Sequence, residues 1–185
     1  MTKLTAALML FPVLMFLGCE NVDLPTPPGA AQAQLVNPEG EKAGTATLTE
    51  TDNGVDVELQ ISNLEPGNHG LHIHEVGSCQ TPDFESAGGH MNPTGAQHGF
   101  EAPAGPHMGD LCNLPVNECG EAETNRTIDN ATLGSGERSL LGKASVIHAE
   151  PDDYESQPAG DAGARVACGV IEMRTPALTW YPAGS

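Results

Sequence analysis

The chain has 185 residues and a formal net charge of −18, because 25 acidic residues oppose only seven lysines and arginines. This length suits one domain with one hydrophobic core, and the scarcity of cations excludes a nucleic-acid-binding protein, which needs a basic patch. The same charge excludes attraction to anionic lipid, so any contact with a membrane would need a covalent anchor.

The N-terminus has the pattern of an export signal. One lysine precedes an apolar run from Leu4 to Leu17, which is too short for a typical membrane span. Gly18-Cys19 follows, and a small residue directly before a cysteine resembles the bacterial lipoprotein signal. We therefore predict a signal peptide over residues 1–18, a lipid on Cys19, a flexible tether over residues 19–33, and a location in the periplasm or cell envelope. A plain secretory signal and an uncleaved anchor are the alternatives.

Residues 34–185 are predicted to form the folded domain, and it reads as all-β. Helical periodicity is nearly absent, whereas short alternating segments recur between turn residues. The clearest is a hairpin over residues 43–64, in which Asn53-Gly54 favours the positive φ angles of a tight turn. Further strands are expected over residues 34–37, 69–74, 113–116, 121–129, 144–148 and 165–173. This number of short strands predicts a sandwich or barrel.

Two long intervals interrupt the strand pattern, at residues 75–110 and 149–164, and both are rich in glycine and proline. Loops of this length in a compact domain are usually functional or disordered. The first interval carries a cysteine, three histidines and an aspartate, which favours function.

The histidines are the strongest chemical signal. His72 and His74 are two residues apart on a predicted strand, so their imidazoles share one face, while Ile73 points to the core. Alone, this pair also fits a half-exposed polar strand. The other candidate ligands follow along the chain: His90, His98, His107, Asp110 and His148. Imidazole suits zinc and copper, so the whole set indicates a metal protein with two sites, and His69 is left as a structural histidine.

Five cysteines in an exported chain indicate disulfides with one thiol left over. If Cys19 carries lipid, the other four allow three pairings, among which spacing alone does not choose. Cys112 and Cys119 are close enough in sequence to close a small loop, and we expect that disulfide. A pair of small buried thiols is the alternative.

The segments GLHIHEVGSC, SAGGHMNP, QHG, PHMGDL, VIHAEPDDY and GDAGARVACGVIEM occur in an order that closely resembles the copper/zinc superoxide dismutase family. The resemblance covers roughly residues 34 to 173. It implies an eight-stranded Greek-key β-barrel or sandwich with two long functional loops. It also implies an enzyme that converts superoxide to dioxygen and hydrogen peroxide by copper redox cycling, with a structural zinc.

The resemblance assigns a role to each candidate residue. His90 would bridge the two metals and carry a proton during turnover, and Arg165 would orient the superoxide anion. Asp152 would link a copper histidine to a zinc histidine, and Cys79 would form a disulfide with Cys168. The implied copper ligands are His72, His74, His90 and His148. The implied zinc ligands are His90, His98, His107 and Asp110.

Some features depart from the family's better-known pattern. The second long loop, AEPDDYESQPAGDAG, contains no lysine, whereas many members place superoxide-steering lysines there. A non-catalytic copper-binding envelope lipoprotein on the same scaffold is the alternative function, although all implied copper ligands and Arg165 are present. Family members include dimers, so a homodimer is a further expectation from the resemblance.

Overall fold

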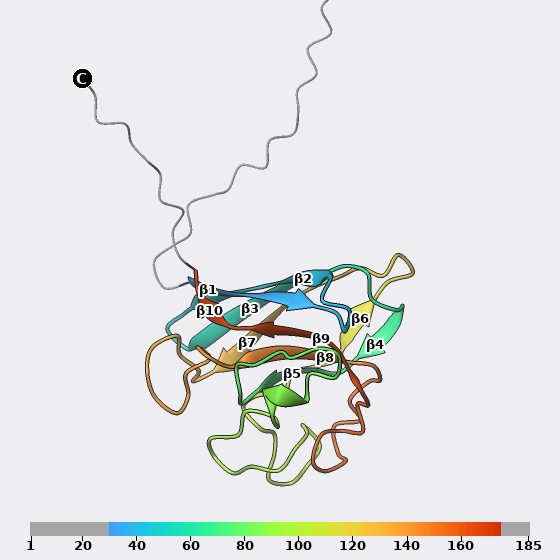
Figure 1. Cartoon of the computed structure of the whole chain (residues 1–185). Coiled ribbons are helices and arrows are strands. Elements are labelled where there is room, and N and C mark those ends of the chain that lie inside the picture. Colours follow the sequence, from blue (N-terminus) through green and yellow to red (C-terminus); the bar gives the residue numbers. More distant parts are fainter. Residues whose placement is uncertain (1–29, 175–185) are drawn as a thin grey trace, which may run out of the picture.

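The structure is a computed structural model that describes residues 30–174, and its regular elements are almost entirely β-strands (Figure 1). The strands are β1 (Ala30–Val36), β2 (Lys42–Glu50), β3 (Gly54–Ile61), β4 (Gly67–His69), β5 (Leu71–His74), β6 (Leu114–Val116), β7 (Ala122–Asp129), β8 (Ala144–His148), β9 (Arg165–Val170) and β10 (Glu172–Met173). A short 3₁₀ turn, η1 (Glu85–Ala87), lies in the first long loop. None of the helical structure within residues 30–174 has the length and apolarity to cross a membrane.

Eight strands form one antiparallel sheet, in the order β5-β8-β9-β1-β2-β3-β7 with β10 beside β1. Strands β4 and β6 form a separate pair. The neighbours β3 and β7, β5 and β8, and β9 and β1 are far apart in sequence, as in a Greek key. In Figure 1 the sheet curls so that β1 and β2 lie across from β5 and β8. The all-β barrel predicted from the sequence is therefore confirmed.

The core lies inside this curled sheet and follows from strand alternation. On β3, Val55, Val57 and Leu59 are fully or almost fully buried, while Glu58 and Gln60 between and beyond them are exposed. Successive side chains of a strand point to opposite faces, so an alternating sequence buries one face and solvates the other. The apolar alternation that predicted the hairpin thus also builds the core.

The domain begins earlier than the sequence indicated. Strand β1 starts at Ala30, so residues 30–33, which were assigned to the flexible tether, are part of the sheet. Ala31 and Ala33 are fully buried, and Ala33 lies opposite Ala46 of β2. Composition was misleading here because alanines and glutamines can also form a strand when neighbouring strands pair with it. The predicted signal peptide and the predicted lipid on Cys19 concern residues outside the described range.

Two predicted strands are each divided in two. The segment 69–74 breaks at Gly70, because β4 pairs with β6 whereas β5 pairs with β8. A Cβ at Gly70 would lie 2.9 Å from the Ala162 Cβ, so the break also allows a close approach of the second long loop. The segment 165–173 breaks at the fully buried Ile171, after which β10 pairs with β1. The predicted hairpin is present, and its required glycine is Gly54, where a Cβ would lie 2.1 Å from the Ile128 carbonyl oxygen.

Both long loops are ordered against the barrel, at the lower end of the view in Figure 1. The first runs from β5 to β6 and returns twice to β5. There the Ile73 N–H donates to the Gly109 carbonyl at 2.8 Å, and the Met91 N–H donates to the Ile73 carbonyl at 2.8 Å. The second loop joins β8 to β9, and its Tyr154 carbonyl accepts from the Glu101 N–H at 3.1 Å. The loops therefore bring distant polar residues to the face of β5.

Candidate metal centre

A first cluster of potential ligands forms where β5, β8 and the first loop meet. Its ligand atoms all lie within 4.8 Å of one another, and its members are His72, His74, His90 and His148. His72 and His74 come from one face of β5, as their spacing predicted, while Ile73 joins the hydrophobic core. The isolated bridge between His74 and His90 places the loop histidine beside the strand. All four side chains are at least nine-tenths buried.

A second cluster shares His90 with the first. Its ligand atoms also lie within 4.8 Å of one another, and its members are His90, His98, His107 and Asp110. One carboxylate oxygen, Asp110 Oδ1, lies 2.8 Å from His90 Nδ1, 3.1 Å from His98 Nδ1 and 3.2 Å from His107 Nδ1. His90 therefore points one ring nitrogen at each cluster.

The Asp152 carboxylate connects the two clusters, because it accepts a hydrogen bond from one histidine of each cluster. His72 Nε2 donates to Asp152 Oδ2 at 2.8 Å, and His98 Nε2 donates to Asp152 Oδ1 at 3.0 Å. Gly160 in the same loop has a φ of +67°, and a Cβ there would lie 1.9 Å from Asp152 Oδ1. Only glycine lets the backbone pass this close to the carboxylate.

The remaining ring nitrogens identify the metal-facing atoms. His72 Nδ1, His90 Nε2 and His98 Nδ1 are buried without a hydrogen-bond partner. His74 Nδ1 donates to the Gly88 carbonyl at 2.9 Å and His148 Nδ1 to the Gly163 carbonyl at 3.1 Å, which leaves their Nε2 atoms facing each other at 3.3 Å. Buried polar atoms normally have partners, and two imidazole nitrogens directed at each other suit a shared cation. The donor set therefore fits two bound metal ions.

Comparison with known proteins agrees with this geometry. The family model of copper/zinc superoxide dismutase matches residues 42–171. The chain belongs to the copper/zinc superoxide dismutase family. Superoxide dismutase [Cu-Zn] 1 from Aquifex aeolicus is 46% identical over 145 residues, which are 76% of this chain and 86% of the relative. Because this chain belongs to the family, it is a superoxide dismutase with copper and zinc as cofactors and superoxide as substrate.

Solved structures of superoxide dismutase relatives share the fold. A double mutant of a SOD-like protein from Bacillus subtilis has a TM-score of 0.73 at 42% identity, over 77% of this chain and 97% of that one. The Cu/Zn superoxide dismutase from Brucella abortus has a TM-score of 0.65 at 29% identity, over 77% of this chain and 99% of that one.

The dismutase fold buries three histidines of the first cluster, and this burial lowers their pKa values enough to keep them neutral. Burial lowers the pKa of His72 from 6.5 to about 4, of His74 to about 2 and of His148 to about 3. For Asp110, burial alone would raise the pKa, but hydrogen bonds from His90 and the Gly99 N–H outweigh it and hold the pKa below its usual range. At neutral pH these three histidines therefore present unprotonated nitrogens and Asp110 presents an ionised carboxylate, the forms that bind metals.

These pKa shifts predict that the metal-free protein loses stability as the pH falls from about 6.5 to about 4. In this range an unfolded histidine binds a proton, whereas folded His72, with a pKa of about 4, does not. The unfolded state then binds more protons, so acid favours unfolding, at about 1.4 kcal/mol for each unit of pKa difference. Urea unfolding of the metal-free protein at several pH values measures this. A midpoint that stays constant or rises toward pH 4 would contradict the burial of neutral histidines.

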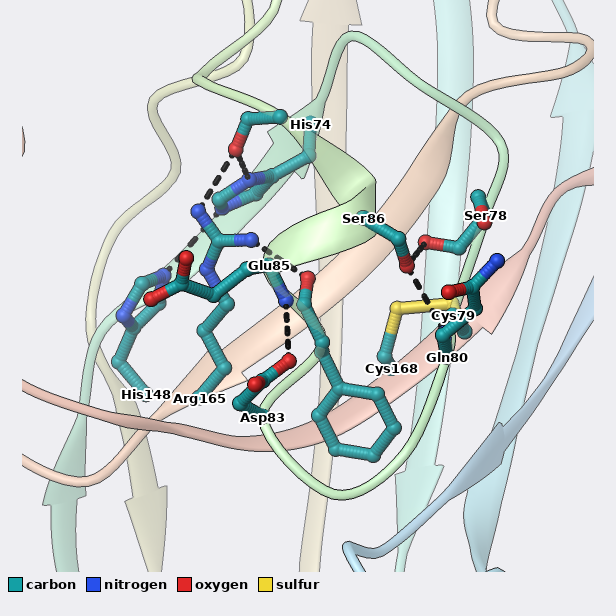
Figure 2. The surroundings of a disulfide bond; sticks show 12 residues. His74, Ser78, Cys79, Gln80, Asp83, Glu85, Ser86, His148, Arg165 and Cys168 are labelled. Atoms are coloured by element: carbon teal, nitrogen blue, oxygen red, sulfur yellow. Dashed lines mark hydrogen bonds between the residues drawn. A yellow bond between two sulfur atoms is a disulfide. The ribbon is translucent and has the colours of Figure 1, made fainter.

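Arg165 lies beside the first cluster and is held by backbone carbonyls (Figure 2). Its Nη1 donates to the Phe84 carbonyl at 2.5 Å and its Nη2 to the Gly88 carbonyl at 2.7 Å. Gly88 also accepts from His74, so one carbonyl positions both the arginine and a histidine. These carbonyls flank η1, in the loop that the disulfide between Cys79 and Cys168 joins to β9. This disulfide, which the resemblance implied, is confirmed.

The second expected disulfide is absent, which corrects the prediction from sequence. Cys112 and Cys119 are both free and exposed, so they are not buried thiols either. Cys112 lies before strand β6, and Cys119 lies in the turn that follows the strand. A separation of seven residues in the sequence did not reveal that a strand and part of a turn lie between the two thiols.

Several supporting residues could not be found from the sequence. Asn113 and Asp152 form a reciprocal pair, in which Asn113 Nδ2 donates to the Asp152 carbonyl and the Asp152 N–H donates to Asn113 Oδ1, both at 2.8 Å. Gln157 forms a similar pair with the backbone of His98. The His98 N–H donates to Gln157 Oε1 at 2.9 Å, and Gln157 Nε2 donates to the His98 carbonyl at 2.8 Å. No local pattern marks these amides, because their partners are 39 and 59 residues away. His69 is structural, as expected: its ring nitrogens contact the carbonyls of His148 and Glu65.

Proposed function

We propose that the two clusters are the copper and zinc sites of this superoxide dismutase. Copper would be held by Nδ1 of His72 and by Nε2 of His74, His90 and His148. Zinc would be held by Nδ1 of His90, His98 and His107 together with Asp110. The observation that carries this assignment is the set of buried ring nitrogens that have no partner or face one another. An all-nitrogen set suits copper, and three imidazoles with one carboxylate suit zinc.

When bound, copper supplies the alternation between two oxidation states that oxidises one superoxide to dioxygen and reduces the next to peroxide. The protein's own side chains bind the superoxide anion and transfer the proton. His90 Nε2 faces the copper cluster without a hydrogen-bond partner, so whenever this atom is not bound to copper it can take up a proton and deliver that proton to peroxide. Arg165 uses two N–H groups on carbonyls, and its guanidinium has five in all. The remaining donors are free to bind the superoxide anion.

Substrate access is through a cavity of about 690 Å³ lined by His74, His90, His148 and Arg165. Asp83 and Glu85 line the same cavity, and the loop over residues 149–164 contributes no lysine. Among the described residues that line it, Arg165 is the one cation. Because the whole chain is strongly acidic, this local positive charge has to offset an unfavourable overall field.

Paired ligand variants test the two assignments. Replacing His148 with alanine should remove copper and leave zinc, because His148 belongs only to the first cluster. Replacing His107 with alanine should remove zinc and leave copper, because His107 belongs only to the second. Elemental analysis of both variants after equilibration with limiting metal gives the answer. Equal loss of both metals in both variants would contradict two separable sites.

Replacing Asp152 with asparagine should weaken the binding of both metals, by about 10-fold to 100-fold each. The carboxylate accepts from His72 and His98, and an amide can accept from only one of them. Chelator competition measures the two affinities. Asp153→Asn is the matched control, because Asp153 is exposed and bonds only to its own turn. Loss of affinity for only one metal would show that Asp152 does not couple the sites.

We propose that the protein is exported and anchored through a lipid on Cys19, with residues 1–18 as the signal peptide. The sequence pattern supports this, and the Cys79–Cys168 disulfide fits an oxidising compartment outside the cytoplasm. The full chain expressed in a bacterium should partition with membranes, and Cys19→Ser should release it. Membrane partition that persists in Cys19→Ser would contradict the lipid. A homodimer is the remaining proposal from the family, and sedimentation of the purified protein tests it.

A further inference from the structure

A second hollow lies between the end of the first long loop and strand β7, and it shares His107 with the lining of the copper-side cavity. Its volume is about 410 Å³, within the range of small-ligand sites. One part of its wall is apolar and includes Phe100, Met108, Leu111 and Ile128. Phe100 is 47% exposed, which is unusual for a large aromatic side chain. The pocket therefore has an accessible apolar surface.

The other part of the wall carries Arg126 and Arg138. Every ion pair among residues 30–174 joins a histidine to an aspartate, so neither arginine pairs with a carboxylate in this acidic protein. Arg126 Nη1 donates to the Asn125 carbonyl at 2.9 Å, while its Nε is buried without a partner. Two guanidinium groups thus reach one pocket with most of their donors unused.

We propose that this pocket binds a small organic carboxylate. A guanidinium fork matches a carboxylate in two parallel hydrogen bonds, and the apolar wall would cover the hydrocarbon part of the ligand. Two acidic side chains also line the pocket. Asp110 already accepts hydrogen bonds from the N–H groups of Gly99 and His107. Asp129 is exposed, and its single negative charge is smaller than the combined positive charge of the two arginines.

The net charge of −18 favours a small anion over an acidic macromolecule as the occupant. A second copy of this chain would bring its whole negative surface close to this one, whereas a small anion meets mainly the local field of the arginines. Exposed charges beyond about 8–10 Å are screened at physiological salt. The pocket is therefore suited to a ligand that fits inside it.

The two free cysteines provide a test with an internal control. Cys112 lines the pocket and Cys119 does not, and both are exposed. The full-length, metal-loaded protein is labelled with the uncharged thiol reagent N-ethylmaleimide, and each cysteine is followed by peptide mass spectrometry. Roughly 10 mM benzoate should slow labelling of Cys112 by about threefold or more, as expected for a millimolar Kd. Benzamide, which has the same shape and no charge, should have no effect, and Cys119 should not respond to either compound.

Arginine variants connect the protection to the proposed contacts. Arg138→Gln and Arg126→Gln should each abolish protection by benzoate, whereas Lys42→Gln removes the same charge outside the pocket and should preserve it. Arg138 is exposed, so its variant remains informative if replacement of the half-buried Arg126 disturbs folding. The proposal is overturned by unchanged labelling of Cys112, by equal protection with benzamide, or by protection that survives Arg138→Gln. Protection without benzoate that increases with protein concentration would instead assign the pocket to a second copy.

Discussion

Replacing Arg165 with alanine should lower kcat/KM for superoxide by about tenfold to a hundredfold while the copper and zinc contents stay unchanged. Arg165 is the one cation among the described residues that line the copper-side cavity, and Asp83 and Glu85 line the same cavity. Without it, an anionic substrate would approach a site surrounded by negative charge. The metals should remain because the guanidinium of Arg165 donates its hydrogen bonds to the carbonyls of Phe84 and Gly88 and not to a ligand side chain.

Two further variants separate charge from geometry. Lys42→Ala removes an exposed cation at the start of β2 that does not line the copper-side cavity, and it should leave the rate nearly unchanged. Arg165→Lys keeps the charge but not the fork that binds two carbonyls, so it should recover part of the rate. The loss in Arg165→Ala should shrink as ionic strength rises, because salt screens steering. An unaltered rate in Arg165→Ala would remove this residue from the mechanism.

Replacing Cys79 with serine should destabilise the protein by about 4.6 kcal/mol, the chain-entropy value for a loop of this size. The disulfide joins residues 89 positions apart, so its loss frees a large part of the unfolded chain. It should also loosen the carbonyls of Phe84 and Gly88 that hold Arg165, and activity should fall even where the protein remains folded. Urea unfolding and superoxide decay on the same sample measure both effects.

Cys119→Ser is the control for this experiment, because Cys119 is free and exposed and its loss should change neither property. The prediction fails if Cys79→Ser matches wild type in its unfolding midpoint. A variant that loses stability but keeps full activity when folded would show that Arg165 is positioned without help from the disulfide.

The parts of the structure that the sequence predicted are those with local patterns. Alternation located β2, β3 and β8 closely, and the two-residue spacing of His72 and His74 placed both rings on one face. The specific order of histidines, together with Asp110, Asp152 and Arg165, was informative because the family resemblance supplied the long-range contacts. The structure then placed all of these residues in or beside the two clusters.

The parts that the sequence missed depend on contacts between distant segments. The strand over Ala30–Val36 was taken partly for a tether because its burial comes from β2 and β10, not from its own composition. The prediction of a Cys112–Cys119 disulfide was wrong because Cys112 lies before β6 and Cys119 lies in the turn after it, and both thiols are free. The two hydrogen bonds between Gln157 and the backbone of His98 join the two long loops, and no local sequence pattern predicts a contact between them.

Pulse radiolysis of the protein tests the central claim most directly, with copper and zinc quantified in the same sample. We expect fast first-order decay of superoxide whose rate is proportional to copper content and is lost in His148→Ala. Full copper occupancy with decay no faster than in buffer alone would contradict a dismutase and would leave a copper-binding protein on the same scaffold.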